Sequence, residues 1–405
     1  MSDTAPDLVV AVLNCGSSSI KFALFDASAG LQALPRRPWW GGKVLGIGGP
    51  APRLQTQDGT DRPLPLGDAA PYHDALAAIL AALRERLGST PLQAVAHRVV
   101  HGGAAHAEPV RVDAGVLAEL RSYIPLAPLH QPFALEAMEA LLQLHPTLPQ
   151  VACFDTAFHR SLPQVEQMLP LPYSAWERGL RRYGFHGLSY EYQSLVLPER
   201  HGAQASGRCI VAHLGSGASL CALQGLRSVA TTMGFSALDG LMMGTRCGAL
   251  DPGAVLYLME IEGLSLHDVG QLLYHQSGLL GVSGRSAEPR ELLAHEADDP
   301  RCAAALALFV RRIVREIGAL VAVLGGLDLL VFTAGIGEHQ AEIRERVVQG
   351  LGFLGASLDA AANAAHAPVI SAAQSTVRVA VEPANEEWVA ARHALRVLAA
   401  TPGAA

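Results

Sequence analysis

The chain has 405 residues, of which 50% are hydrophobic and 17% are charged. This composition supplies enough apolar surface for two domains and argues against disorder on a large scale. The formal charge of -7 gives no broad basic surface, so we expect no nucleic-acid partner. The acidic first residues do not match a signal peptide, and no uninterrupted apolar run is long enough for a membrane span, so we expect no membrane attachment.

The cysteines indicate a reducing compartment. Six of them stand at positions 15, 153, 209, 221, 247 and 302, without a close-spaced pair. Such spacing fits free thiols in the cytoplasm better than disulfides or a zinc ribbon. His97 and His101 could share one face of an extended segment, but no third metal ligand stands at a suitable spacing. A cysteine hydrolase is disfavoured because no Cys-His pairing is visible.

In chain order, β-rich runs occupy residues 8–13, 95–100, 151–154, 209–214, 329–333 and 377–381. Helices are predicted between them, with single apolar stripes over 74–87 and 306–324. Residues 317–336 read as a buried helix followed by a buried strand, because Gly325, Gly326 and Asp328 interrupt the run. Proline-rich segments 33–65 and 163–172 are predicted to be surface connections. The alternation indicates an α/β fold.

One pattern occurs twice. Residues 8–13 lead into a small polar turn, Asn-Cys-Gly-Ser-Ser-Ser, and residues 209–214 lead into Gly-Ser-Gly-Ala-Ser. A second apolar run follows each turn. Turns of Gly and Ser let backbone N–H groups approach an anion closely. Either turn alone would read as an ordinary hairpin, but their recurrence favours a duplicated pair that holds a polyphosphate.

The familiar nucleotide-binding motifs are absent. The only lysines are Lys21 and Lys43, and neither follows a glycine-rich loop of the P-loop type. The signature set of protein kinases is also missing. Residues 332–339 place a Gly-x-Gly turn directly after a buried strand, which is weak evidence by itself. A nucleotide would therefore need another architecture.

Eight segments, in order along the chain, resemble the acetate kinase family. They are residues 14–22, 97–103, 125–130, 154–159, 182–187, 243–248, 334–338 and 385–387. The resemblance implies an α/β fold with two duplicated actin-like, ribonuclease H-like domains and an active site in the cleft between them. We expect an N-terminal domain over 1–156 plus a C-terminal helix at about 390–405, and a nucleotide-binding domain over 157–389.

The resemblance also implies a reaction. Acetate kinases transfer the γ-phosphoryl of ATP reversibly to acetate, giving acetyl phosphate and ADP by direct in-line transfer. The implied cofactor is Mg²⁺, or Mn²⁺ in its place, with ATP or ADP as co-substrate. Family members are homodimers, so we expect a dimer. The alternatives are a propionate or other short-chain acyl kinase and, on the same fold, a catalytically idle nucleotide-binding protein.

Catalytic roles follow from the matched motifs. Arg98 and Arg246 match the family's active-site arginines, and a planar guanidinium suits carboxylate and phosphoryl oxygens. His186 matches the histidine that stabilises the transition state, where an N–H donor is useful. His130 is expected nearby in a secondary role. Without the resemblance, each histidine would read as structural and each arginine as a surface charge.

A magnesium site is implied at Asn14 and Glu386, since Mg²⁺ prefers oxygen ligands and keeps several waters. Asp155 could be read as a general base. Acetate, however, is already ionised near neutral pH and needs no proton removed. We therefore expect Asp155 to orient the metal or its waters. Glu387 reads as a helix or surface neighbour.

Two further sets are carried over. The apolar pocket for the substrate's methyl group comprises Val100, Leu129, Phe185 and Ala237. The nucleotide-binding set comprises Ser19, Lys21, His213, Leu214, Gly215, Ser216, Gly217, Glu288, Pro289, Arg290, Gly335, Ile336, Gly337, Glu338 and His339. Pocket size discriminates weakly, because one methylene is worth only about 1 to 3 kcal/mol.

The chain departs from the family pattern at a few positions. Ser216 and His339 stand where asparagines are usual, and Glu288 and Pro289 replace an aspartate and a bulky residue. These changes bear on nucleotide choice. Ala237 replaces a proline and would widen the methyl pocket, which makes propionate a rival substrate.

Overall fold

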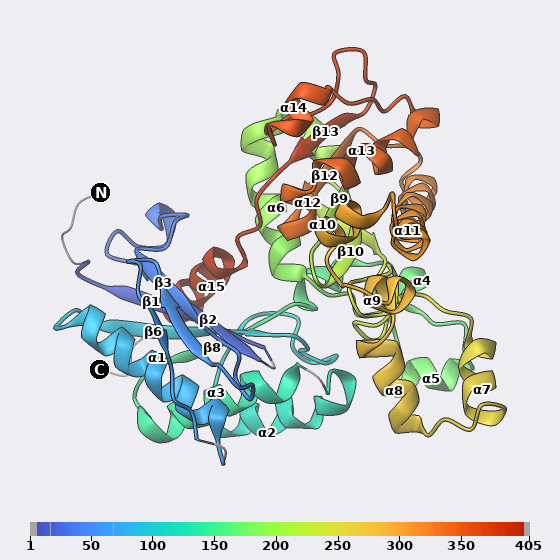
Figure 1. Ribbon diagram of the computed structural model, residues 1–405. Helices are drawn as coiled ribbons and strands as arrows, with labels where there is room; N and C mark the ends of the chain where they lie inside the picture. Colours follow the sequence, from blue (N-terminus) through green and yellow to red (C-terminus); the bar gives the residue numbers. More distant parts are fainter. Residues whose placement is uncertain (1–5, 17, 68, 129, 401–405) are drawn as a thin grey trace. The chain divides into compact units, whose positions relative to one another are not determined.

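The computed structural model describes residues 6–16, 18–67, 69–128 and 130–400. The chain divides into two compact units (Figure 1). Unit 1 comprises Met1–Ala157 and Asn385–Ala405, and unit 2 comprises Phe158–Ala384. The chain returns to unit 1 at Asn385, a few residues before the predicted boundary near residue 390. The reason is that α15 (Glu386–Ala400) packs against β1, β6 and β8 of unit 1.

Unit 1 is built on an eight-stranded sheet in the order β5-β4-β3-β2-β1-β6-β8-β7. The strands are β1 (Val9–Cys15), β2 (Ser19–Asp26), β3 (Trp40–Leu45), β4 (Arg53–Thr56), β5 (Asp61–Pro63), β6 (Leu92–Val99), β7 (Val110–Arg111) and β8 (Gln150–Phe154). The helices besides α15 are α1 (Pro71–Leu87), α2 (Ala114–Ser122) and α3 (Gln131–Leu144).

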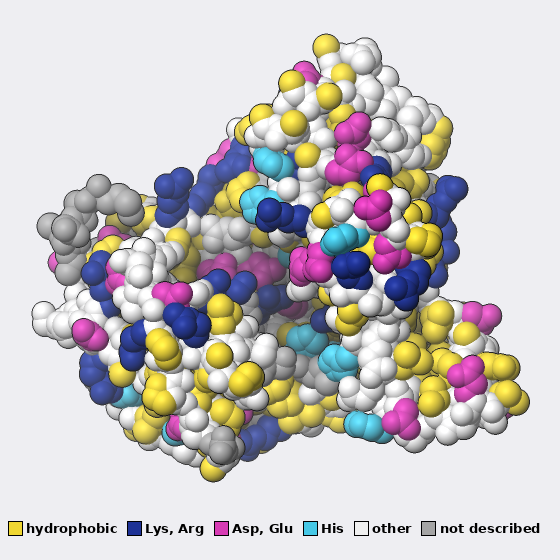
Figure 2. Space-filling view, viewed as in Figure 1, with side chains coloured by type: hydrophobic (Ala, Val, Ile, Leu, Met, Phe, Trp, Pro, Cys, Tyr) yellow, Lys and Arg dark blue, Asp and Glu magenta, His cyan; other side chains and the backbone are white. Residues whose placement is uncertain are grey.

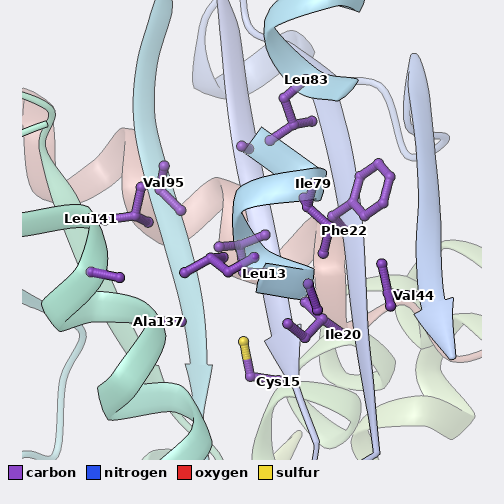
Figure 3. Close-up of a cluster of buried hydrophobic side chains, with 14 of the residues drawn as sticks. Leu13, Cys15, Ile20, Phe22, Val44, Ile79, Leu83, Val95, Ala137 and Leu141 are labelled. Atoms are coloured by element: carbon purple, nitrogen blue, oxygen red, sulfur yellow. The ribbon is translucent and has the colours of Figure 1, made fainter. Parts of the chain in front are cut away.

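Side-chain alternation along β2 separates the two faces of this sheet. Ile20, Phe22 and Leu24 are buried and join one core cluster with Ile79 of α1 and with residues of α3 (Figure 3). Successive side chains of a strand point to opposite faces, so Lys21 faces away from that core. On the opposite face lies α15, since the Cys153 thiol approaches the carbonyl oxygen of Ala390 at 3.8 Å.

The prediction that residues 33–65 form only a surface connection is wrong. The segment contains β3, β4 and β5, which extend the sheet beyond β2. The prolines misled the prediction because they lie between these strands or, at Pro63, end the edge strand, where a missing N–H is tolerated. Trp40 of β3 packs against Phe22 with ring centroids 5.4 Å apart. The other predicted connection, residues 163–172, contains only the short helix α4 (Gln164–Gln167).

Unit 2 repeats the central topology of unit 1. Its sheet has the order β11-β10-β9-β12-β13, and its strands are β9 (Arg208–Leu214), β10 (Ala218–Gln224), β11 (Arg227–Thr231), β12 (Leu329–Thr333) and β13 (Arg378–Val381). In both units two antiparallel pairings are followed by two parallel ones, so β11-β10-β9-β12-β13 corresponds to β3-β2-β1-β6-β8. The predicted α/β fold with duplicated domains is confirmed.

The helices of unit 2 are short except for α6 and α11. They are α4, α5 (Tyr173–Glu177), α6 (Gly187–His201), α7 (Pro252–Glu260), α8 (Leu266–His275), α9 (Gly278–Ser283), α10 (Pro289–His295), α11 (Pro300–Leu324), α12 (Ala334–His339), α13 (Ala341–Gln349) and α14 (Ala360–Ala364). The buried helix and strand predicted in residues 317–336 are the end of α11 and β12. Within the described ranges, no helix is long and apolar enough to cross a membrane.

Candidate active site

Two glycine turns meet at one edge of the unit 2 sheet. β9 and β10 are joined by Gly215–Gly217, where the Gly215 N–H donates to the Gly217 carbonyl at 3.1 Å. β12 runs parallel to β9 with Thr333 opposite His213, so α12 begins at the same edge. A methyl group on Gly215 would stand 3.6 Å from Ala334 Cβ. The two glycine-containing segments predicted to hold nucleotide are therefore neighbours.

His186 is held in an unusual conformation beside this hairpin. It is the N-cap of α6 and has left-handed dihedrals, φ 59° and ψ 26°. Its Nδ1 lies 2.8 Å from the Ser219 hydroxyl, which also bonds the Tyr190 hydroxyl at 2.5 Å. The ring stacks on that of His213 with centroids 4.1 Å apart. Left-handed non-glycine residues are uncommon and gather at functional sites.

Ser219 and Tyr190 were not predicted as site residues. The only sequence signal for Ser219 was its place in the second small-residue turn. Tyr190 gives no signal of its own, because a tyrosine on a helix is usually read as part of the core. His213, predicted for the nucleotide, is a direct neighbour of His186, and its Nδ1 lies 2.9 Å from the Ser189 hydroxyl.

Arg246 lies beside the same hairpin. Its Nη1 donates to the Ala237 carbonyl at 3.1 Å, and burial lowers the pKa of this guanidinium. A methyl group on Gly217 would stand 3.1 Å from His186 Nε2 and 3.8 Å from Arg246 Nη1. One imidazole and one guanidinium therefore converge on Gly217. Donors converging on a glycine turn can bind a phosphoryl group.

In unit 1, Arg98 is clamped between two carboxylates. Its Nε lies 3.1 Å from both Asp155 oxygens, and its Nη2 lies 2.7 Å from Oδ2. Its Nη1 pairs with Glu386 Oε2 at 2.8 Å. Burial alone would lower the Arg98 pKa, but the charges of Asp155 and Glu386 more than offset this and raise it. Arg98 is thus a permanent cation in a fixed orientation.

Asn14 completes this cluster on the sheet side. Asn14 of β1 is the register partner of Arg98 of β6, so their side chains share a face. Glu386 stands at the start of α15, where the helix dipole favours a carboxylate. Burial nevertheless raises the pKa of Glu386 from 4.5 to about 7, against the attraction of Arg98.

These oxygens suit Mg²⁺. In the part of the chain that the structure describes, no group of three or more His, Cys, Asp or Glu could hold a metal ion. One amide oxygen and a carboxylate are enough, because Mg²⁺ keeps several waters. The two carboxylates also outnumber the single guanidinium, so the cluster carries negative charge that a divalent cation would balance.

The remaining predicted residues are distributed over both units. Val100 follows β6, and Phe185 is buried with its carbonyl 2.9 Å from His159 Nε2. His130 is the N-cap of α3. Leu129 lies outside the described residues. Glu288, Pro289 and Arg290 open α10, and Ser19 and Lys21 lie on β2.

Glu338 also has a structural contact, and the cysteines are buried or partly buried thiols. The Glu338 carboxylate accepts from the Ala384 N–H at 2.9 Å, which fixes the end of unit 2. All six cysteines are free, and burial raises the pKa of Cys15 and Cys221 to about 12. A thiol with such a pKa is protonated near neutral pH, which argues against Cys15 and Cys221 as nucleophiles.

Comparison with known proteins identifies the chain. The family model described as "Acetokinase family" matches residues 9–392. An acetate kinase of Rhodopseudomonas palustris is 51% identical over 403 residues, covering 96% of this chain and 98% of its own. The crystal structure of an acetate kinase from Porphyromonas gingivalis superposes with a TM-score of 0.85 at 36% identity, covering 96% of this chain and 99% of that one.

Propionate kinases are similar as well. One from Citrobacter rodentium is 41% identical over 407 residues, covering 98% of each chain. The fold and these matches define a phosphotransferase that has a carboxyl group as acceptor. The resemblance seen in the eight sequence segments is confirmed: the chain belongs to the acetokinase family.

Proposed function

We propose that this chain is an acetate kinase that moves the γ-phosphoryl of ATP reversibly to acetate by direct in-line transfer. The observation that carries the proposal is the convergence of His186 and Arg246 on the Gly217 turn. Phosphoryl transfer asks a protein mainly for positioning and for donors around the equatorial oxygens. An imidazole and a guanidinium on one glycine turn supply both.

In the transfer, an acetate oxygen bonds to the γ-phosphorus while the bond from that phosphorus to the β–γ bridging oxygen breaks. ADP carries away the electron pair. No proton is removed, because the carboxylate enters ionised. Asp155 is therefore not needed as a base, and its bonds to Arg98 support a role in orienting that guanidinium.

Magnesium is proposed to bind at Asn14 and Glu386. Asp155 would fix the position of the charged Arg98 guanidinium beside the ion. When bound, the ion would neutralise phosphate oxygens and help align the reactants. Asn14 and Glu386 both adjoin Arg98, by strand register and by ion pair. Mn²⁺ is expected to substitute, because it also prefers oxygen ligands.

ATP is the proposed phosphoryl donor, held by the glycine segments 213–217 and 335–339 of unit 2. Their adjacency at the sheet edge supports this role. Ser216, Glu288, Pro289 and His339 replace the residues usual in the family, so ATP and GTP should be compared directly. The acyl pocket is proposed at Val100, Leu129, Phe185 and Ala237, with His130 nearby.

One assay tests the reaction, and one panel tests the substrate. The protein, incubated with acetate, ATP and Mg²⁺, should produce an acyl phosphate that hydroxylamine traps as the hydroxamate. No hydroxamate with any short carboxylate would contradict the proposal and favour an idle nucleotide-binding protein. kcat/KM for acetate, propionate and butyrate then ranks the substrates. A higher value for propionate would make the chain a propionate kinase with a pocket widened at Ala237.

A homodimer is also proposed, with α7 and α8 in the interface. Large apolar side chains of this region are exposed, namely Leu250, Leu256, Tyr257, Met259, Ile261 and Leu266. Figure 2 shows apolar surface gathered where Figure 1 places α7. Exposed apolar clusters of this kind mark protein interfaces. Tyr257→Asp should shift the molecular mass in light scattering from dimer to monomer, and an unchanged dimer would place the interface elsewhere. The free cysteines support a cytoplasmic location.

A further inference from the structure

Two buried hydroxyl groups stand behind His186, the histidine proposed to stabilise the transferring phosphoryl group. The Ser219 hydroxyl lies 2.8 Å from His186 Nδ1 and 2.5 Å from the Tyr190 hydroxyl. Ser219 and Tyr190 are both fully buried, so these hydroxyl groups bond to the protein and not to bulk water. The proposed reaction uses His186 as a donor, but it gives no part to Ser219 or Tyr190.

Local structure brings these side chains together. Tyr190 follows His186 by one helical turn, and its N–H donates to the His186 carbonyl at 3.1 Å. Ser219 of β10 is the register partner of His213 of β9, so the side chains of Ser219 and His213 lie on the same face of the sheet. The His186 ring stacks on His213 and bonds to Ser219. Both strands of the glycine hairpin therefore fix the orientation of this ring.

The ring is oriented with Nε2 toward the glycine turn. A methyl group on Gly217 would stand 3.1 Å from His186 Nε2, whereas Nδ1 is the nitrogen that bonds to Ser219. A phosphoryl oxygen at this turn could only accept a hydrogen bond, so Nε2 must carry a hydrogen to bind it. A neutral imidazole has one ring hydrogen, and its other nitrogen is an acceptor. In the productive neutral ring, Nδ1 therefore accepts from Ser219.

Neighbouring groups favour the neutral form of His186 before nucleotide binds. The methyl position on Gly217 that lies near Nε2 is also 3.8 Å from Arg246 Nη1, so a charge on the imidazole would stand close to the guanidinium. The ring centroids of His186 and His213 are 4.1 Å apart, so a charge on either ring would oppose a charge on the other. Like charges at such short range favour the uncharged form.

We propose that Tyr190 and Ser219 are positioning residues that keep His186 in its neutral Nε2–H tautomer, with that N–H directed at the transferring phosphoryl group. The Tyr190 hydroxyl donates to Ser219 Oγ, and Ser219 donates its single hydrogen to His186 Nδ1. A phenol is a stronger acid than an aliphatic alcohol, so Tyr190 takes the donor end of this chain. The inference rests on the proposed function and adds two residues to it.

A second buried pair in unit 2 gives a matched comparison. His159 Nδ1 lies 2.8 Å from the Ser228 hydroxyl, the same distance as in the pair of His186 and Ser219, and all four residues are buried. His159 Nε2, however, lies 2.9 Å from the Phe185 carbonyl oxygen, which can only accept. The backbone therefore keeps the hydrogen of His159 on Nε2 even without Ser228, whereas the tautomer of His186 depends on Ser219.

The first test observes the tautomer and needs no turnover. In protein that is isotope-labelled at the histidine nitrogens, long-range proton–nitrogen NMR spectra distinguish the two neutral tautomers and the cation. The signals of His186 are those missing from His186→Gln. Without ligands at slightly alkaline pH, His186 should be in the Nε2–H form, and Ser219→Ala should raise the share of the Nδ1–H form by about tenfold, since one hydrogen bond is lost. A cation or an Nδ1–H tautomer in the unmodified protein would overturn the proposal.

The second test measures the rate of acyl phosphate formation. Ser219→Ala should lower kcat by about tenfold or more and change KM for ATP and acetate by less than about threefold, because it removes orientation and no substrate contact. Ser219→Thr keeps the hydroxyl and should recover most of the rate. Tyr190→Phe removes one oxygen atom and keeps the ring, so it tests the same network if Ser219→Ala does not fold. It should lower kcat by about threefold or more.

Ser228→Ala is the matched control. It also removes a buried serine hydroxyl from a histidine Nδ1, but it should leave the NMR signals of His186 unchanged and kcat within about twofold. Unchanged kcat in both Ser219→Ala and Tyr190→Phe, or an equal loss of kcat in Ser219→Ala and Ser228→Ala, would overturn the proposal. If the unmodified protein forms no hydroxamate, the proposed function fails, and the NMR spectra still report the tautomer separately.

Discussion

The two units share a strand order, yet they treat their key arginine differently. In unit 1, Arg98 is bonded to Asp155 and Glu386, and these charges raise its pKa. In unit 2, Arg246 contacts a carbonyl oxygen and the Met243 sulfur, and burial lowers its pKa. In unit 1, the positive charge of Arg98 is therefore already neutralised by carboxylates of the same unit.

Because of this difference, we expect Arg98 and Arg246 to have different roles in binding the phosphoryl group. A buried cation whose desolvation outweighs the attraction of its neighbours gains most when an anion arrives. Arg246 is in this situation, so it should contribute most to binding the phosphoryl group as charge develops. Arg98 is already held by two carboxylates, so it should contribute orientation as well as charge, and part of its value is structural.

Removal of each arginine gives the largest expected effect. Arg246→Ala should lower kcat by about 10³-fold or more, the range for an arginine that stabilises phosphoryl transfer, with little change in stability. Arg98→Ala should lower kcat and also destabilise the fold by about 3 kcal/mol, because Asp155 and Glu386 lose their counter-charge. Hydroxamate formation and urea unfolding measure the two effects. Arg246→Lys is the control, because it keeps the positive charge but removes the planar guanidinium group. Equal loss of stability in both alanine variants would remove the distinction between the units.

The metal-binding half of unit 1 gives the next effect. Glu386→Gln should raise the Mg²⁺ concentration for half-maximal rate by about 10- to 100-fold. The pKa of Glu386 is raised to about 7, and Mg²⁺ binds the deprotonated carboxylate. Apparent Mg²⁺ affinity in the unmodified protein should therefore fall as pH drops below 7, approaching about tenfold per unit.

Two controls complete that experiment. Glu387→Gln changes the adjacent carboxylate and should leave the Mg²⁺ requirement nearly unchanged. In Glu386→Gln the pH dependence between 7 and 6 should disappear. A requirement for Mg²⁺ that is the same in all three proteins would place the metal on other residues.

The contrast between the units was only partly visible in the sequence. The duplicated turns and the eight segments predicted the α/β fold and the family. The segment 33–65 was misread because prolines conceal short edge strands, whose partner strand lies elsewhere in the chain. The ion pairs of Arg98 depend on three residues from β6, from the end of β8 and from α15, which only folding brings together.

Other features depend on dihedral angles and packing. No sequence pattern predicts the left-handed conformation of His186 or its stacking on His213. Non-glycine residues adopt left-handed dihedrals only rarely, and the neighbouring residues in the sequence do not indicate where this happens. The pairing of Lys21 with Lys43 across β2 and β3 was not predicted either, since this register depends on the burial of one sheet face.

A smaller effect tests whether the close contact between Gly217 and His186 matters for the rate. Gly217→Ala would place a methyl group 3.1 Å from His186 Nε2, so the ring must move by a few tenths of an ångström. We expect kcat to fall by about tenfold or more, since small misplacements cost about that much in rate. Gly352→Ala is the matched control, because Gly352 lies in a short turn outside the proposed site and no described atom lies within 4 Å of its added carbon. A similar fall in both variants would mean that general loss of turn flexibility, not contact with His186, is responsible.

The smallest effect concerns stability in unit 1. His97 is fully buried, and burial lowers its pKa from 6.5 to about 4, against its hydrogen bond to Gln150 at 2.8 Å. The unfolded chain takes up this proton below about pH 6.5 and the folded chain only near pH 4, so stability is complete above 6.5 and is lost as pH falls. Between pH 7 and 5 this loss should be about 2 kcal/mol. In urea unfolding, the free energy of unfolding of His97→Asn should fall by about 2 kcal/mol less between pH 7 and 5 than that of the unmodified protein. The exposed His73→Asn should behave as the unmodified protein, and an unchanged pH slope in His97→Asn would show that other buried groups govern the acid sensitivity of unit 1.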